Sequence, residues 1–129
     1  MGALFTRCKI ENPAERDKSV IVSRILVDTD SEYTWVRAAV LERIGIKKEN
    51  KQLSFVMANG QTITRSVGFA IIRLAKFFTI DEVVFGDKGD LSLLGARTLE
   101  GLNLTVDARR KKLIAAGPLP AAAMITDTD

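Results

Sequence analysis

Residues 26–31 read Leu-Val-Asp-Thr-Asp-Ser, and the interpretation of the whole chain depends on this stretch. An apolar, β-branched run at residues 20–27 leads into it, and such a run predicts a buried strand. The strand delivers the carboxylate of Asp28 and the hydroxyl of Thr29 to the point where the sequence turns polar. A strand that ends in this way can hold a catalytic acid on a rigid support. Aspartate is also a common turn residue, so this stretch alone leaves a catalytic and a purely structural Asp28 both open.

The sequence predicts another strand before residues 20–31 and a short helix after them. Polar and apolar residues alternate at residues 4–10, which indicates a first strand, and residues 11–18 form a charged loop around Asn12-Pro13. We expect the strand at 20–27 to pair antiparallel with the first. Helical spacing of apolar residues over 37–44 predicts two helical turns, and Gly45 is well placed to end them.

A long hairpin is predicted in the middle of the chain. Residues 53–58 alternate and run into Asn59-Gly60, a strong signal for a two-residue type I′ turn whose central positions need positive φ. The return strand covers 61–74, and Gly68 within it predicts a bulge or bend. Most hairpins are purely structural, but the length of this one also fits a projecting, movable element.

The remainder of the pattern is a series of short strands. They are expected at 77–85, 91–94, 102–106 and 111–115, with a brief helix at 95–102 and basic residues 109–112 in a solvated turn. The sequence therefore predicts an all-β fold, closed or sandwich-like, with one or two short helices. A single domain should cover 1–115, and we expect the tail at 116–129 to be disordered or ordered only by a partner.

Composition excludes several classes of function. The chain has 129 residues, of which 47% are hydrophobic and 27% charged, as in globular domains. The net charge of +3 is spread along the sequence, so we expect no nucleic-acid partner. No run is apolar enough for a signal peptide or a membrane span, which predicts a cytoplasmic protein with no membrane partner.

The inventory of reactive side chains is equally restrictive. There is no histidine, which removes Ser-His and Cys-His nucleophiles and His-ligated zinc, and the single Cys8 cannot form an intrachain disulfide. Acid–base chemistry near neutral pH must therefore come from carboxylates, lysine, tyrosine or cysteine. We find no phosphate-binding loop and no cluster of metal ligands, and we expect neither a metal nor another cofactor.

Three short motifs follow one another along the chain. The first is residues 26–31 followed by Thr34, the second is Ala58-Asn59-Gly60, and the third is Leu93-Leu94-Gly95 followed by residues 99–107. Together they resemble the active-site turn, the flap hairpin and the apolar-apolar-Gly strand of the retropepsin-like aspartic peptidases. Small bacterial single-domain members of the retroviral-type family are the most similar, and the resemblance covers residues 5–114.

The resemblance implies a closed, barrel-like acid-protease fold with a flap hairpin. It implies a homodimeric aspartic endopeptidase in which two copies of Asp28 activate a water against a polypeptide substrate. Thr29, Asp30 and Ser31 would support the site, and Ala58, Asn59 and Gly60 would bind substrate as the flap. Leu94 and Gly95 would be structural residues near the site. A second Asp-Thr-Asp at 127–129 follows no apolar strand, and we interpret it as chance.

Asp30 departs from the family pattern, which has glycine at this position. An inward-facing carboxylate would repel the paired Asp28 groups or force the site open, whereas an outward-facing one could be tolerated. The sequence therefore leaves three functions open. They are a working peptidase, a non-catalytic peptide-binding or dimerisation module disabled by Asp30, and a β-barrel interaction module in which Asp28 is only structural.

Overall fold

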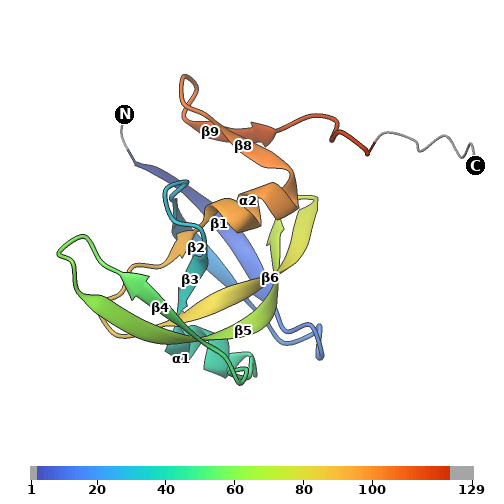
Figure 1. Cartoon of the computed structure of the whole chain (residues 1–129). Helices are drawn as coiled ribbons and strands as arrows, with labels where there is room; N and C mark the ends of the chain where they lie inside the picture. The colour runs from blue at the N-terminus through green and yellow to red at the C-terminus, as the bar shows by residue number, and fades with distance from the viewer. Residues whose placement is uncertain (1–2, 123–129) are drawn as a thin grey trace, which may run out of the picture.

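The computed structural model describes residues 3–122 and is built mainly from short strands (Figure 1). This confirms the prediction of a mostly β chain with one or two short helices, of which the structure has two. The elements are β1 (Leu4–Glu11), β2 (Ser19–Val27), β3 (Thr34–Arg37), α1 (Ala38–Arg43), β4 (Gln52–Val56), β5 (Thr62–Leu74), β6 (Phe77–Gly86), β7 (Leu93–Leu94), α2 (Ala96–Leu102), β8 (Leu104–Asp107) and β9 (Lys112–Ala115).

The strand pairings form a closed circuit. A seven-stranded sheet has the order β1-β2-β7-β3-β6-β5-β4, and β1 pairs in addition with β5. β1 and β2 pair antiparallel, as predicted, whereas β2 pairs parallel with β7 and β3 pairs parallel with β6. β8 and β9 make a separate two-stranded sheet that extends beyond α2 (Figure 1).

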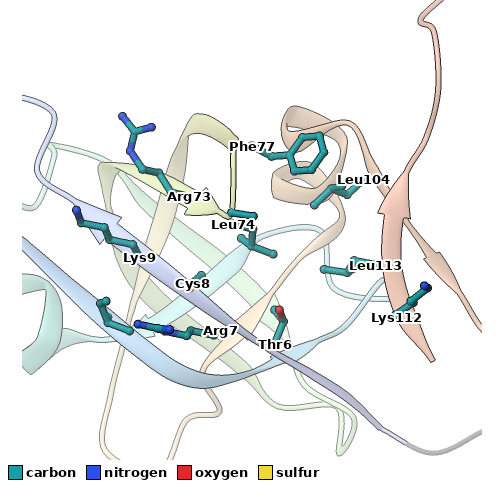
Figure 2. A pocket seen from close by; sticks show the side chains of 12 residues that line it. Thr6, Arg7, Cys8, Lys9, Arg73, Leu74, Phe77, Leu104, Lys112 and Leu113 are labelled. Carbon is teal, nitrogen blue, oxygen red and sulfur yellow. The ribbon is translucent and has the colours of Figure 1, made fainter. Parts of the chain in front are cut away.

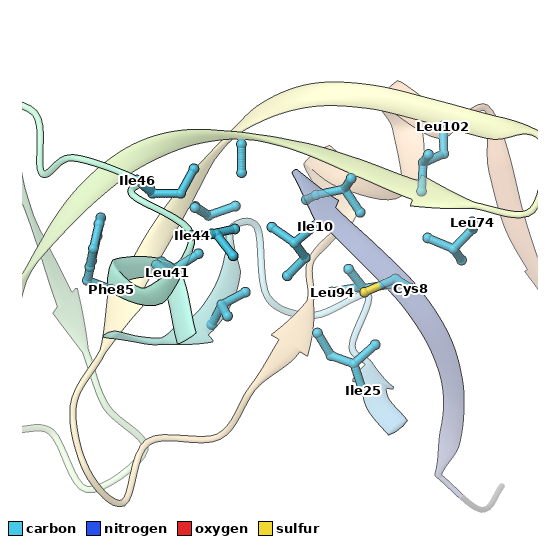
Figure 3. Packing of buried hydrophobic residues seen from close by; sticks show 14 of the residues in the cluster. Cys8, Ile10, Ile25, Leu41, Ile44, Ile46, Leu74, Phe85, Leu94 and Leu102 are labelled. Atoms are coloured by element: carbon cyan, nitrogen blue, oxygen red, sulfur yellow. The ribbon is translucent and has the colours of Figure 1, made fainter. Parts of the chain in front are cut away.

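The core fills the space inside this circuit. Alternate side chains of the strands point inward. Ile10, Ile25, Leu41 and Leu94 are fully buried (Figure 3), and so is Ile72. Burying an aliphatic side chain of this size contributes about 1.5–3 kcal/mol. A smaller cluster of Trp35, Val67, Val84 and Leu93 lies apart from the main core, and the partly buried Tyr33 and Phe55 pack against it. Packing in the core thus keeps the strands that carry Asp28 and Leu94 rigid.

The predicted type I′ turn at Asn59-Gly60 is wrong, and of the bulge or bend predicted at Gly68 the bulge does not form. The β4–β5 hairpin exists, but the Met57 and Gln61 backbones pair across it and Asn59 does not adopt positive φ. Gly60 alone is left-handed, with a φ of 85°, so the loop has three residues instead of the expected type I′ pair. Gly68 makes no bulge, because the β5–β6 register runs through it unbroken. Glycine is needed there because a Cβ would lie 2.7 Å from the Lys47 carbonyl oxygen.

The C-terminal part follows the predicted pattern as far as it is described. Residues 109–111 lie in an exposed turn between β8 and β9, Lys112 begins β9, and residues 116–122 contain neither helix nor strand. The rest of the tail, with its Asp-Thr-Asp at 127–129, lies outside the described residues. Within residues 3–122, no helix is both long and apolar enough to cross a membrane.

Candidate functional site

The turn at the end of β2 holds the Asp28 carboxylate in a defined orientation. The Asp28 amide donates to the Leu94 carbonyl at 2.9 Å, which fixes the turn to β7. The Asp30 amide in turn donates to Oδ1 of Asp28 at 3.1 Å, and the Ser31 amide donates to the Asp28 carbonyl at 3.2 Å. The carboxylate is therefore oriented by the backbone of its own turn, at a half-buried position open to one side.

The first turn of α2 supports this loop from behind. The Ala96 amide donates to the Ser31 carbonyl at 2.7 Å, and the Arg97 amide donates to the Glu32 carbonyl at 3.0 Å. Gly95 lies so close that a Cβ there would overlap the Tyr33 carbonyl and come within 2.7 Å of the Glu32 carbonyl oxygen. Leu94 and Gly95 therefore lie directly against the loop that carries Asp28.

A chain of buried hydroxyl groups completes the support, and sequence reasoning missed most of it. The Gly95 amide donates to Oγ1 of Thr34 at 2.9 Å, and the hydroxyls of Thr34 and Thr98 form a hydrogen bond. Thr98 also donates to Oδ2 of Asp81 at 3.0 Å. Because an ionised carboxylate only accepts, Thr98 must donate to Asp81 and Thr34 must donate to Thr98. Thr34 belongs to the first sequence motif, whereas Thr98 and Asp81 were not identified from the sequence.

Asp28 opens into a groove of about 750 Å³ between its own turn and the β4–β5 hairpin. The structure brings together four of the predicted site residues here, whereas Thr29, Asn59 and Gly60 do not line the groove and are exposed. The lining residues are Asp28, Asp30, Ser31, Glu32, Tyr33, Trp35, Leu53, Ser54, Phe55, Val56, Met57, Ala58, Gly89, Asp90, Leu91 and Leu93. The groove therefore combines an apolar, aromatic wall with a carboxylate edge, and no lysine or arginine lines it.

Aromatic packing fixes the base of the hairpin and leaves its tip free. The Phe55 ring lies 4.7 Å from Trp35 and 6.0 Å from Tyr33, measured between ring centroids, the second pair edge-on. Beyond Phe55 the side chains of Val56 and Met57 are 75% and 40% exposed. The hairpin is therefore anchored over the Asp28 groove and projects past it, consistent with its position in Figure 1.

An ion pair joins the hairpin to the loop that follows β6. Nε and Nη2 of Arg65 donate to the two carboxylate oxygens of Asp90 at 2.8 and 3.3 Å, a bidentate geometry that favours a strong interaction. Hydrogen bonding to Arg65 outweighs burial and lowers the pKa of Asp90 below its usual value, and the same hydrogen bond raises the pKa of Arg65. Sequence reasoning did not identify this pair, because the charges are widely separated along the chain.

Removing this ion pair should loosen the hairpin. We expect Asp90→Asn to lower the free energy of unfolding by about 1–2 kcal/mol and to speed amide hydrogen exchange in β4 and β5. Because folding lowers the pKa of Asp90, its contribution is present above the unfolded value of about 4 and is lost as the pH falls through the folded value. Asp87→Asn is the matched control, since Asp87 is 68% exposed and approaches Arg65 only to 3.5 Å. Equal effects of the two substitutions would contradict this role of Asp90.

No described group suggests a bound metal. Among residues 3–122, no cluster of three or more acidic, cysteine or histidine side chains has the geometry to hold a metal ion. Cys8 is buried, and burial raises the pKa of its thiol to about 12. The carboxylates of the groove and the Tyr33 hydroxyl are thus the groups available for acid–base chemistry near Asp28.

Comparisons with known proteins assign no family to the chain. None of the protein-family models matches it, and a search of the curated proteins finds no significant match. The functional argument therefore depends on the geometry of the Asp28 groove and on the motifs themselves.

Proposed function

We propose that this chain is a retropepsin-like aspartic endopeptidase that acts as a symmetric homodimer. The observation that carries the proposal is the Asp28 carboxylate, oriented by the Asp30 amide and facing a groove beneath the β4–β5 hairpin. The closed circuit of strands is compatible with the barrel-like fold of that family. In this proposal the hairpin is the flap, and the Leu94-Gly95 segment is the element that supports the acid turn.

The proposed mechanism requires two copies of Asp28, since each chain supplies one such turn. Two carboxylates at close range share a proton and titrate as a coupled pair. The ionised partner takes a proton from water as the water oxygen attacks the peptide carbonyl, and the protonated partner hydrogen-bonds the carbonyl oxygen. Transfer of a proton to the amide nitrogen then releases the amine product and regenerates the pair. Thr29, exposed in the single chain, would lie at the two-fold axis and bridge the two turns.

The lining of the groove indicates what substrate it would accept. An extended peptide could add its main-chain hydrogen bonds to the hairpin and place alternate side chains against the walls. The aromatic rings of Tyr33, Trp35 and Phe55 favour apolar side chains, whereas Asp30 and Glu32 favour a neighbouring lysine or arginine. The proposed substrate is therefore a polypeptide segment that combines apolar and basic residues.

The oligomeric state is the first test of this proposal. At micromolar concentration we expect the chain to sediment with twice the mass of a single copy, because one Asp28 cannot form a pair. Sedimentation equilibrium measured between pH 4 and 7 would establish the mass over the range in which cleavage is assayed. A chain that stays monomeric throughout, also with a peptide substrate present, would contradict the proposal.

A second candidate function is favoured by the position of Asp30. Asp30 is exposed and is one of the residues that line the same groove as Asp28, so each subunit would bring an additional negative charge close to the paired acids. Such crowding could leave a peptide-binding or dimerisation module without catalysis.

Asp30→Gly distinguishes the two candidates. Like charges near a protein surface cost on the order of 1 kcal/mol per pair, so we expect Asp30→Gly to raise cleavage of an unstructured protein by about tenfold. Asp30→Asn is the matched control, because it removes the charge while keeping the size of the side chain. If only Asp30→Gly is active, the natural chain is the non-catalytic module. If neither variant exceeds the parent, repulsion from Asp30 does not limit the site.

A further inference from the structure

A second groove lies on a different part of the molecule and shares no residue with the Asp28 groove. It has a volume of about 790 Å³ and lies among β1, the β5–β6 turn and the β8–β9 hairpin (Figure 2). Its lining residues are Thr6, Arg7, Cys8, Lys9, Ile21, Arg73, Leu74, Ala75, Phe77, Leu104, Lys112 and Leu113. Four of these are cationic and none is acidic, while the others are mainly apolar.

The apolar and basic groups occupy different parts of this groove. Figure 2 shows Leu74, Leu104 and Leu113 between β1 and the hairpin, with Lys112 to one side and Lys9 and Arg73 to the other. A ligand that fits must therefore offer an apolar stretch and negative charge next to it. We call this surface the basic groove.

Neighbouring carboxylates do not balance the charge of the basic groove. Glu11 lies behind it. Its Oε2 is 2.6 Å from Nε of Arg73 and 3.6 Å from Nζ of Lys9, and its Oε1 is 3.2 Å from Nε of Arg16. One carboxylate thus serves three cations, and its own side chain is 6% exposed. Within residues 3–122, neither Arg7 nor Lys112 has an ion-pair partner. The groove therefore keeps an excess of positive charge for a ligand.

The chain itself contains a segment of matching chemistry. Residues 118–129 read Pro-Leu-Pro-Ala-Ala-Ala-Met-Ile-Thr-Asp-Thr-Asp, an apolar stretch followed by two carboxylates. The segment begins beside the groove. The Gly117 carbonyl accepts a hydrogen bond from Nδ2 of Asn103 at 2.9 Å, and the Ala116 amide donates to the Asn103 carbonyl at 2.9 Å. Asn103 directly precedes Leu104, which lines the groove.

We propose that residues 123–129 fold back and occupy the basic groove of their own chain, while residues 118–122, which are exposed in the structure, serve as the tether. Met124 and Ile125 would pack against Leu104 and Leu113, and Asp127 and Asp129 would pair with the cations of the rim. Twelve extended residues reach about 40 Å, so the segment has ample length to turn back from Gly117. A short tether holds a ligand at an effective concentration in the millimolar range, so even weak contacts suffice for docking in cis.

A spin label on the segment tests this proposal on the full chain. Burial keeps the Cys8 thiol protonated at neutral pH, so a nitroxide reagent would modify only the thiol introduced by Thr128→Cys. We expect the methyl NMR signals of Leu104 and Leu113 to lose most of their intensity, while those of Leu53 in β4 are unchanged. Adding Arg7→Gln and Lys112→Gln should restore at least half of the lost signal. The matched control is Arg109→Gln with Arg110→Gln, two cations of the β8–β9 turn that do not line the groove.

Each result decides for or against the proposal. Full methyl intensity in the labelled chain would overturn it. Spin-labelled chains mixed with isotope-labelled, unmodified chains would show whether a second copy is the occupant, and broadening found only in that mixture would overturn docking in cis. If the Leu104 and Leu113 methyl signals lose the same intensity in the Arg7/Lys112 variant as in the Arg109/Arg110 variant, the proposed pairing of the segment's aspartates with the groove cations is overturned. The readout involves no peptide cleavage, so failure of the proposed peptidase activity would leave this result unaffected.

Discussion

Asp28→Asn is expected to abolish peptide-bond cleavage, lowering kcat/KM by at least about 10³-fold. An amide cannot exchange a proton with the attacking water or the substrate carbonyl. It has nearly the same shape as the carboxylate, and its oxygen could still accept the hydrogen bond from the Asp30 amide. The fold and the thermal unfolding temperature should therefore change little. Cleavage of an unstructured protein between pH 4 and 7, followed by mass spectrometry, measures the loss.

The control for this substitution is another aspartate outside the groove. Asp17 is exposed in the loop between β1 and β2 and does not line the Asp28 groove, so Asp17→Asn should leave both cleavage and stability unchanged. Activity that survives in Asp28→Asn would show that the acid pair is not the catalyst. Equal losses in the two variants would point to a general effect of net charge.

Gly95→Ala is expected to destabilise the protein by about 3 kcal/mol, at the upper end of what overpacking usually costs. The new methyl group would meet the carbonyl groups of Tyr33 and Glu32, which belong to the backbone and cannot rotate away. The Asp28 turn must therefore separate from α2, and we expect cleavage to fall together with stability. Denaturant unfolding measures the first effect, and the same peptide assay measures the second.

Gly86 offers a matched control for this prediction. It is buried like Gly95, but a Cβ there would meet the Val36 carbonyl oxygen at 3.4 Å and the Asp90 Cβ at 3.5 Å, which are ordinary contacts. Gly86→Ala should therefore change the free energy of unfolding by less than about 1 kcal/mol. If Gly95→Ala is equally mild, the loop and α2 are more adaptable than their spacing indicates.

Local periodicity was sufficient to predict most of the strands. Strict alternation at residues 4–10, the apolar run at 20–27 and the Asn-Gly hairpin signal each depend on neighbouring residues, and the elements they predict are present. The exact turn was not predictable in this way, because type I′ and three-residue loops both place a left-handed glycine at the same point. Gly60 fits either, and the choice between them depends on the pairing of Met57 with Gln61.

The support of the candidate site depends on contacts that the linear pattern does not contain. Thr34, Thr98 and Asp81 come from three elements, and although Thr34 belongs to the first sequence motif, nothing in the segments around Thr98 and Asp81 indicates that the three side chains meet. Gly68 was predicted to mark a bulge or bend, because its close approach to the backbone at Lys47 cannot be read from β5 alone. The homodimer and the bridging role of Thr29 stay predictions, because they concern a second copy of the chain.

The parallel pairing of β2 with β7 also determines when the Asp28 turn can form during synthesis. Asp28 lies early in the chain, yet its amide is held by Leu94, more than sixty residues later. At about 5–20 residues per second, a ribosome needs several seconds to make the intervening chain. β1 and β2 can pair as a local hairpin in that time, whereas the acid turn waits for β7 and α2. A nascent chain would therefore carry Asp28 unassembled, so any chemistry at this residue begins only after most of the domain has been made.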